Sequence, residues 1–297
     1  MTRSYKYQLD NVATCACLFS DFPGILSGDK IAFLDPHMAY FQYQEGNLPP
    51  RLTSSRQFIM NSHEMRKFPH QFEPFKQKLF GSLNLNQWYN GTVFRFPLRQ
   101  DGSRSMVSST VYNDQKMKQM LTMLQSEAHS LILFLNSVES IEWYEKSSPS
   151  DEPRLMFAVK VGDHCRQSVR RNRASFLTEI QPFTAHKQWK PASTHVTYEM
   201  TTSVKNMVRG QQSLDSKRWL VTQHFQGGSH APQLKRIMTS GASKLLPWVG
   251  VALPLGENNA YQPQGQLFCF LPLPDSEDSD TGFHFHVNGY FAVSQNR

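Results

Sequence analysis

Two stretches, Phe268-Cys-Phe-Leu-Pro-Leu-Pro274 and His284-Phe-His-Val-Asn-Gly-Tyr-Phe-Ala-Val293, carry most of the information about the fold of this chain. Both are dense in aromatic and apolar residues, which is typical of strands. The residues between them are mostly polar and acidic, as in a loop. We therefore predict two strands joined by a loop close to the end of the chain.

Strand patterns dominate the rest of the sequence. Apolar or alternating runs between turn residues predict further strands at 30–34, 93–98, 131–135, 140–144, 155–159, 176–180, 195–200, 218–222 and 248–253. In 93–98, Phe94, Phe96 and Leu98 alternate and are expected to face the core. The pair Asn90-Gly91 before them is interpreted as a tight turn.

Three helices are expected among these strands, at 7–19, 114–129 and 234–246. The helix at 114–129 has the clearest pattern, because its apolar residues recur at steps of three and four and Asn113 can cap its start. Few helices among many strands predict a mixed α/β fold of the α+β type. The serine-rich stretch near Gly102 suggests a boundary, so we expect two regions, 1–105 and 106–297.

Composition sets broad limits on function. The 297 residues are 39% hydrophobic and 19% charged, with a net charge of +7. Such a chain can bury a sizeable core, and its modest positive charge favours acidic partners only mildly. The four cysteines form no CxxC pair, and no signal peptide or run of about 20 apolar residues is present. We expect a cytoplasmic protein that is not inserted in a membrane.

No residue pattern predicts catalysis, a cofactor or a metal. His284 and His286 would share one side of a strand, but zinc needs three or four ligands and no further ligand has a matching spacing. Cys269 lies between two phenylalanines, where a cysteine is more simply a core residue than a nucleophile. The glycine pair at 227–228 does not extend into a phosphate-binding loop. We therefore assign no catalytic, cofactor-binding or metal-binding residue.

The densest basic cluster is Arg166, Arg170, Arg171 and Arg173. Arginines hold nucleic acid through its phosphates, so a basic nucleic-acid-associated module is the alternative function for this chain. The nearby aromatics are interpreted as strand residues of a core, and no RNA-binding signature accompanies them. A solvated hairpin tip or a protein-contact patch is the preferred interpretation of the cluster.

Several stretches along the chain together carry a specific signature. They are Ser27-Gly-Asp-Lys-Ile-Ala-Phe-Leu-Asp-Pro-His37, Tyr89-Asn-Gly-Thr-Val-Phe-Arg-Phe-Pro-Leu-Arg99, Ser108-Ser-Thr-Val-Tyr112, Leu131-Ile-Leu-Phe-Leu-Asn-Ser-Val138, Gly265-Gln-Leu-Phe-Cys-Phe-Leu-Pro-Leu-Pro274, Thr281-Gly282 and Val287-Asn-Gly-Tyr-Phe-Ala292. In order and spacing they resemble the sacsin repeat along nearly the whole chain.

The resemblance implies a fold related to the ATPase and middle domains of the ninety-kilodalton heat-shock chaperones. Region 1–105 would be the C-terminal part of an ATPase-like two-layer sandwich, and 106–297 a mixed-sheet, middle-domain-like region. The family's ATP-binding residues precede the stretch that begins at Ser27, and the residues before it here include no Asp-x-Gly motif. We therefore expect no autonomous ATP hydrolysis and no cofactor; an ATPase would require upstream sequence or another chain to supply the nucleotide site.

The resemblance also implies a chaperone or co-chaperone role in protein folding and quality control. Seventy-kilodalton heat-shock chaperones and client proteins are the expected partners, and the incomplete sandwich would also leave apolar surface for self-association. The residues expected to contact partners are Phe268, Phe270, Phe285 and Tyr290. The competing interpretation is that these four side chains pack the terminal strands into the core.

Overall fold

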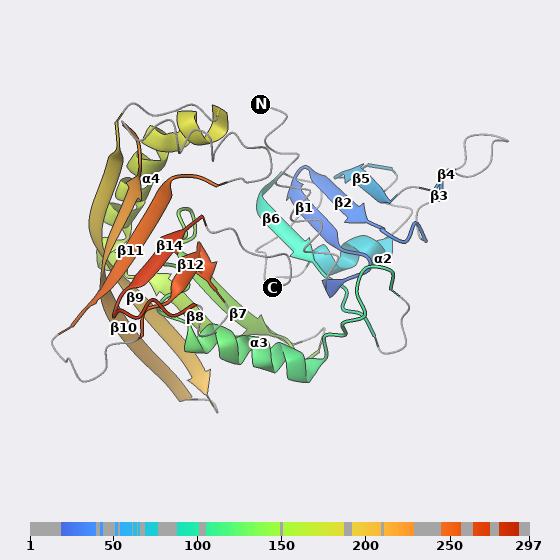
Figure 1. Cartoon of the computed structure of the whole chain (residues 1–297). Coiled ribbons are helices and arrows are strands. Elements are labelled where there is room, and N and C mark those ends of the chain that lie inside the picture. The colour runs from blue at the N-terminus through green and yellow to red at the C-terminus, as the bar shows by residue number, and fades with distance from the viewer. Residues whose placement is uncertain are drawn as a thin grey trace. The chain divides into compact units, whose positions relative to one another are not determined.

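A computed structural model describes residues 19–39, 42–43, 51–52, 54–60, 62–63, 65, 69–76, 88–100, 105–148, 151–186, 192–208, 211–228, 245–256, 264–273 and 279–290. It is a mixed α/β structure with two main sheets and few helices, which confirms the expected α+β class (Figure 1). The contacts between residues divide the chain into two units, Met1–Gln119 and Met120–Arg297. The predicted helix at 234–246 lies almost wholly outside the described residues, as does the one at 7–19.

Unit 1 is built on a four-stranded antiparallel sheet in the order β5-β2-β1-β6. Its strands are β1 (Gly24–Gly28), β2 (Lys30–Leu34), β5 (Ser55–Ile59) and β6 (Tyr89–Arg95). Unit 1 also contains a two-stranded ribbon of β3 (Gln42–Tyr43) and β4 (Arg51–Leu52) and the short helices α2 (Pro69–Phe72) and η2 (Glu73–Lys76). The core forms where Phe33 of β2 meets Phe72 and Phe75 edge to face.

The Ser-Gly-Asp stretch at 27–29 is the turn of a β-hairpin. Ser27 pairs with Lys30, so Gly28 and Asp29 are the two turn residues. Gly28 has a φ of 61°, a left-handed conformation that glycine adopts without strain. The predicted strand at 30–34 is confirmed as β2, whereas its partner β1 was missed.

Strand β6 presents the opposite face to the one expected. Val93 is buried at 5% exposure, whereas Phe94 and Phe96 are 42% and 37% exposed and Leu98 is 40% exposed. The two phenylalanines instead stack on one another. The alternation was correct and the choice of face was wrong, because Val93 is the residue that meets the core of unit 1. Asn90-Gly91 is also not a turn, since both residues lie inside β6 beside a break in its register.

Unit 2 is built on an eight-stranded sheet in the order β13-β12-β14-β11-β10-β9-β8-β7. The strands are β7 (Ser140–Glu145), β8 (Arg154–Val161), β9 (Thr194–Val208), β10 (Gln211–Phe225), β11 (Trp248–Leu255), β12 (Leu267–Cys269), β13 (Leu271–Pro272) and β14 (His286–Gly289). The pairing is antiparallel except between β12 and β14. Of the two terminal strands predicted first, 268–274 is instead broken at Phe270, with a φ of 65°, into β12 and β13, which pair antiparallel with one another. The second is confirmed as β14, which lies beside β12.

Helix α3 (Asp114–Ser126) confirms the strongest helix prediction, although it ends three residues before the expected His129. Asn113 caps it as expected, because its side-chain oxygen accepts a hydrogen bond from the Lys116 backbone N–H at 3.0 Å. The side chain of Leu121 is buried in the core of unit 2.

Helix α4 (Asp163–His186) corrects the prediction of a strand at 176–180. Val169, Arg173, Phe176 and Ile180 are all at most 2% exposed and recur at steps of four, three and four. That spacing places them on one helical face, and Figure 1 shows α4 running along the sheet of unit 2. Because the second of these four residues, Arg173, is charged, the sequence did not indicate the apolar period of a helix.

The predicted strand at 131–135 is also wrong. Leu131, Ile132, Leu133 and Phe134 are at most 5% exposed, but they form consecutive turns rather than a strand. Their carbonyl groups therefore need partners other than a strand ladder. Arg173 supplies some of these partners, as described below.

Across the part of the chain that the structure describes, no helix has the length and apolar character needed to cross a lipid bilayer.

Candidate functional site

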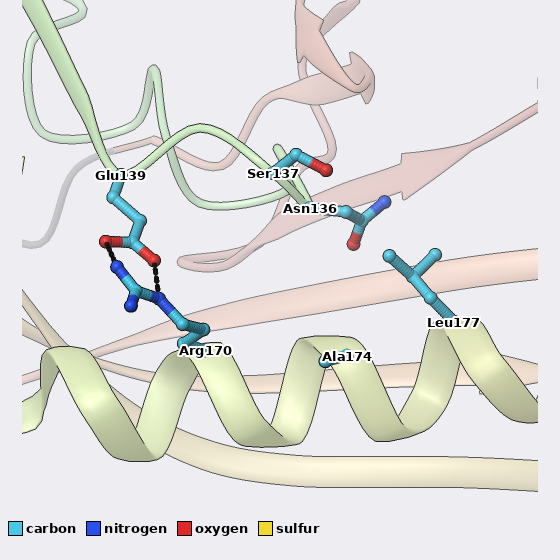
Figure 2. Close-up of a pocket in the computed structure, with 6 residues that line it drawn as sticks. All are labelled: Asn136, Ser137, Glu139, Arg170, Ala174 and Leu177. Carbon is cyan, nitrogen blue, oxygen red and sulfur yellow. Dashed lines mark hydrogen bonds and ion pairs between the residues drawn. The ribbon is translucent and has the colours of Figure 1, made fainter. Parts of the chain in front are cut away.

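Two adjoining pockets lie along α4 in unit 2 and share the side chain of Leu177. We call them together the α4 groove. The first pocket, of about 440 Å³, is lined by Asn136, Ser137, Glu139, Arg170, Ala174 and Leu177 (Figure 2). The second, of about 380 Å³, is lined by Leu177, Thr178, Ile180, Gln181, Trp248 and Tyr290. The first pocket therefore contains charged side chains, whereas the second contains none and combines aliphatic and aromatic side chains with the polar groups of Thr178 and Gln181. We call these the charged end and the apolar end of the groove.

At the charged end, Arg170 and Glu139 form a two-pronged ion pair, visible in Figure 2. Arg170 Nε donates to one carboxylate oxygen at 2.6 Å and Nη2 donates to the other at 2.7 Å. The hydrogen bonds from Arg170 lower the pKa of Glu139, and the charges of Arg166 and Arg173 act in the same direction. Glu139 is thus held ionised, and it keeps the forked guanidinium of Arg170 in place.

Arg173 lies beneath this end of the groove, in the core at 2% exposure. Its guanidinium donates to the carbonyl oxygens of Ile132 at 2.8 Å, Leu133 at 3.3 Å and Val138 at 3.2 Å, and to the Tyr198 hydroxyl at 3.2 Å. Its hydrogen bonds thus tie the irregular segment 132–138 to α4 and β9. This segment carries Asn136 and Ser137, so Arg173 shapes the groove without lining it.

A chain of hydrogen bonds links the two ends of the groove and fixes its polarity. The Trp248 indole N–H, which can only donate, bonds to Gln223 Oε1 at 3.2 Å. Gln223 Nε2 must therefore point the other way, and it donates to the Tyr198 hydroxyl at 3.3 Å and to Asn136 Oδ1 at 3.4 Å. Because the oxygen of Asn136 is used in this way, its amide nitrogen is the atom available to the pocket.

At the apolar end, aromatic rings from three strand regions cluster together. Trp248 lies 5.3 Å from Phe270 and 6.0 Å from Tyr290, and Phe270 lies 5.1 Å from Tyr290, measured between ring centroids. Phe176 of α4 packs edge to face on Trp248 at 5.4 Å. Burial raises the pKa of Tyr290 to about 12, so its hydroxyl stays neutral over the physiological range.

The sequence-predicted contact residues are placed in different environments. Phe270 and Tyr290 join the aromatic cluster, with Tyr290 in the lining of the groove. Phe268 is fully buried at 0% exposure and packs on Phe134 and His286. Phe285 is half-buried and stacks on the exposed Phe283, away from the lining of either pocket.

The four predicted basic residues lie on helix α4, which corrects the expected hairpin tip, and they do not form one exposed patch. Arg170 lines the groove, Arg171 is exposed on α4 outside the pocket lining, and Arg173 is in the interior. Arg166 pairs with Asp163 at 2.6 Å and approaches Glu139 at 4.0 Å. Acidic neighbours thus offset part of the positive charge of this cluster.

Sequence reasoning missed the other groove residues. Leu177 follows Phe176 on α4. It would have been found if the period of a helix, rather than that of a strand, had been applied to 176–180. Asn136 lies in the stretch 131–138 that carries the resemblance, but nothing in that stretch assigned it a role, and Glu139 follows directly after it.

Among the residues that the structure describes, two histidines pair with aspartates outside the groove. In unit 2, His129 contacts the Thr202 hydroxyl and the Asp215 carboxylate, each at 3.0 Å. Thr202 is 0% exposed and its oxygen also accepts the Trp219 N–H at 2.9 Å, so it is not accessible as a nucleophile.

In unit 1, one oxygen of Asp21 accepts hydrogen bonds from Arg99 at 2.8 Å and Ser105 at 2.7 Å, and lies 3.1 Å from His37 Nε2. Because the same oxygen receives all three groups, Asp21 does not orient the histidine toward the serine as a hydrolase triad requires. The Asp21 cluster joins distant parts of unit 1. No group of three or more metal-ligating side chains is found among the residues that the structure describes.

Comparison with known proteins agrees with the motifs. Residues 17–158 match the model of the Sacsin domain family. The chain is 29% identical to Sacsin of Homo sapiens over 289 residues, which is 94% of this chain and 6% of that protein. It thus spans only a small part of the length of this relative. The stretches that carry the resemblance contain three features described above. These are the hairpin turn at Gly28, the histidine His37 that contacts Asp21, and the terminal strand pair. Residues 17–158 thus match the Sacsin domain family, and the similarity to human Sacsin extends over most of this chain.

Proposed function

We propose that this chain is a sacsin-like chaperone or co-chaperone module that binds polypeptide segments in the α4 groove and does not hydrolyse ATP by itself. The observation that carries the proposal is the meeting of two unlike pockets at Leu177. A polypeptide presents polar backbone and apolar side chains side by side, so it can occupy both pockets at once. The volumes of about 440 and 380 Å³ are each large enough for side chains rather than only for water.

The resemblance to sacsin supports the setting of this activity. Under the proposal the module acts in protein folding and quality control in the cytoplasm, with client proteins and seventy-kilodalton heat-shock chaperones as partners and with self-association as a further interaction. The same resemblance supports a relation of residues 1–105 and 106–297 to the ATPase and middle domains of the ninety-kilodalton heat-shock chaperones. Because the similarity covers 6% of human Sacsin, we propose these features for this chain.

Nucleic-acid binding by the arginine cluster is the weaker alternative. Nucleic acid needs several exposed cations on one surface, whereas Arg173 is buried and Arg166 is paired with Asp163, which leaves Arg170 and Arg171 as the exposed members of the cluster. These placements favour the protein-binding proposal.

We expect the chain to slow the aggregation of dithiothreitol-reduced insulin without added nucleotide, and Leu177→Gln to weaken this effect. Leu177 lies in both pockets, and replacing its apolar side chain by an amide of similar length removes apolar area from the groove. The loss of a buried leucine contact corresponds to roughly tenfold weaker client binding. Light scattering at increasing chain concentration measures the effect.

The matched control is Leu214→Gln, because Leu214 lies on β10 and is 67% exposed outside the groove. Thermal unfolding of both variants identifies any general loss of folding. Equal protection by Leu177→Gln and the unmodified chain, or no protection by either, would contradict the proposed function.

A further inference from the structure

We propose that the α4 groove selects polypeptide segments in which an acidic side chain lies close to a large apolar side chain. This inference rests on the proposed function and names the class of segment bound. The carboxylate occupies the pocket of Arg170 and Asn136, and the apolar side chain occupies the pocket of Trp248 and Tyr290.

Arg170 keeps donors free for such a ligand. A guanidinium carries five N–H groups, and Glu139 uses one on Nε and one on Nη2. The side chain is 66% exposed, and neither hydrogen bond to Glu139 uses the Nη1 donors. Glu139 fixes the direction of the fork and leaves this side of it unoccupied, which prepares Arg170 to bind a second carboxylate.

Asn136 adds a second donor at the same end. The hydrogen bonds that run from Trp248 through Gln223 use its oxygen, so its amide nitrogen is the group left to donate to a ligand. A cationic guanidinium and an amide N–H together favour an anionic, acceptor-rich group. The exposed Arg171 on the same helix adds to the positive potential around this end.

The apolar end of the groove determines which kind of side chain lies near the acidic residue in the bound segment. Leu177 and Ile180 of α4 and the rings of Trp248 and Tyr290 line it. Trp248 is itself held by Gln223 and by packing on Phe176, so its ring is pre-oriented. Because Leu177 is shared by both pockets, the acidic and apolar side chains of the ligand must be close together along the segment.

The test uses capped, fluorescently labelled peptides that contain one phenylalanine and a single glutamate one to three residues away, each paired with the glutamine analogue. Fluorescence anisotropy with the full chain measures binding. We expect the best glutamate peptide to bind roughly tenfold more tightly than its glutamine analogue at low salt, with the difference shrinking as salt rises.

Two groove variants should abolish this preference. Arg170→Gln removes the cation, and Asn136→Asp keeps an oxygen for Gln223 while replacing the donor by a carboxylate. The matched control is Arg171→Gln, which removes the same charge from the same helix outside the pocket lining. This variant should keep at least half of the preference for the glutamate peptide, measured as the logarithm of the affinity ratio. Leu177→Gln should weaken both peptides of a pair equally.

The outcomes separate this inference from the proposed function. If the glutamate and glutamine peptides bind equally well, or if Arg171→Gln removes the preference as completely as Arg170→Gln, the selection of an acidic segment is overturned while polypeptide binding stands. If no peptide binds at all and insulin aggregation is also unaffected, both proposals fail. Loss of the preference in both groove variants, with folding intact by circular dichroism, supports it.

Discussion

Replacing Arg173 by methionine is expected to lower the free energy of unfolding of unit 2 by about 4 kcal/mol. The carbonyl groups of Ile132, Leu133 and Val138 all accept hydrogen bonds from this one side chain. Buried acceptors left without a partner cost about 1–3 kcal/mol each, so the total exceeds what methionine regains by packing. Replacing a buried ion is harmless only when its partners are replaced too, and here the acceptors belong to the backbone.

Urea denaturation followed by tryptophan fluorescence measures this change, because Trp219 and Trp248 are buried in unit 2. The control is Arg171→Met, an exposed position on the same helix that should change stability by no more than about 0.5 kcal/mol. Arg173→Lys should be intermediate, because one ammonium cannot span the acceptors that the planar guanidinium reaches. A cost below about 1 kcal/mol for Arg173→Met would refute the role assigned to this residue.

The second large effect concerns His286 and acid. Burial first, and the charge of Lys217 second, lower the pKa of His286 to about 4 in the folded protein. Its Nδ1 also accepts the backbone N–H of Gln266 at 3.1 Å, which requires the neutral ring. In the unfolded chain the pKa is about 6.5, so below that pH the unfolded state takes up a proton that the folded state does not.

This difference makes unit 2 less stable as the pH falls from about 6.5 toward 4, with a contribution from His286 of about 3 kcal/mol when both states are protonated. We expect His286→Gln to flatten the pH dependence of the unfolding free energy over this range, since the amide can still accept the Gln266 N–H. His284→Gln, at an exposed position two residues earlier, should leave it unchanged. Identical slopes for the two variants and the unmodified chain would show that His286 is not held neutral.

Much of the fold could be predicted where one pattern acts alone. The strands β2, β7, β8, β9, β10 and β11 all have clear apolar runs, and the cap of α3 follows from Asn113 alone. Strand β1 was not predicted because its five residues include two glycines, which weaken any strand pattern. The face of β6 could not be chosen from alternation, since both faces carry apolar residues and only contact with the core decides between them.

The groove was harder to predict for a physical reason. The apolar stripe of α4 is readable once Arg173 is accepted as a core residue, but a buried arginine is rare enough that the sequence favours the opposite choice. The positions of Asn136 and Glu139 depend on hydrogen bonds that Arg173 and Arg170 make across more than thirty residues of sequence. Such contacts are set by tertiary packing and leave no local signal.

Hydrogen–deuterium exchange of the full chain, with and without a permanently unfolded client such as reduced and carboxymethylated α-lactalbumin, tests polypeptide binding in the α4 groove most directly. We predict slower exchange on client addition in segment 132–139 and in the part of α4 from Arg170 to Gln181, with no change at the exposed start of β10, residues 211–216. Unchanged exchange in both groove segments, with or without protection elsewhere, would contradict the proposed site.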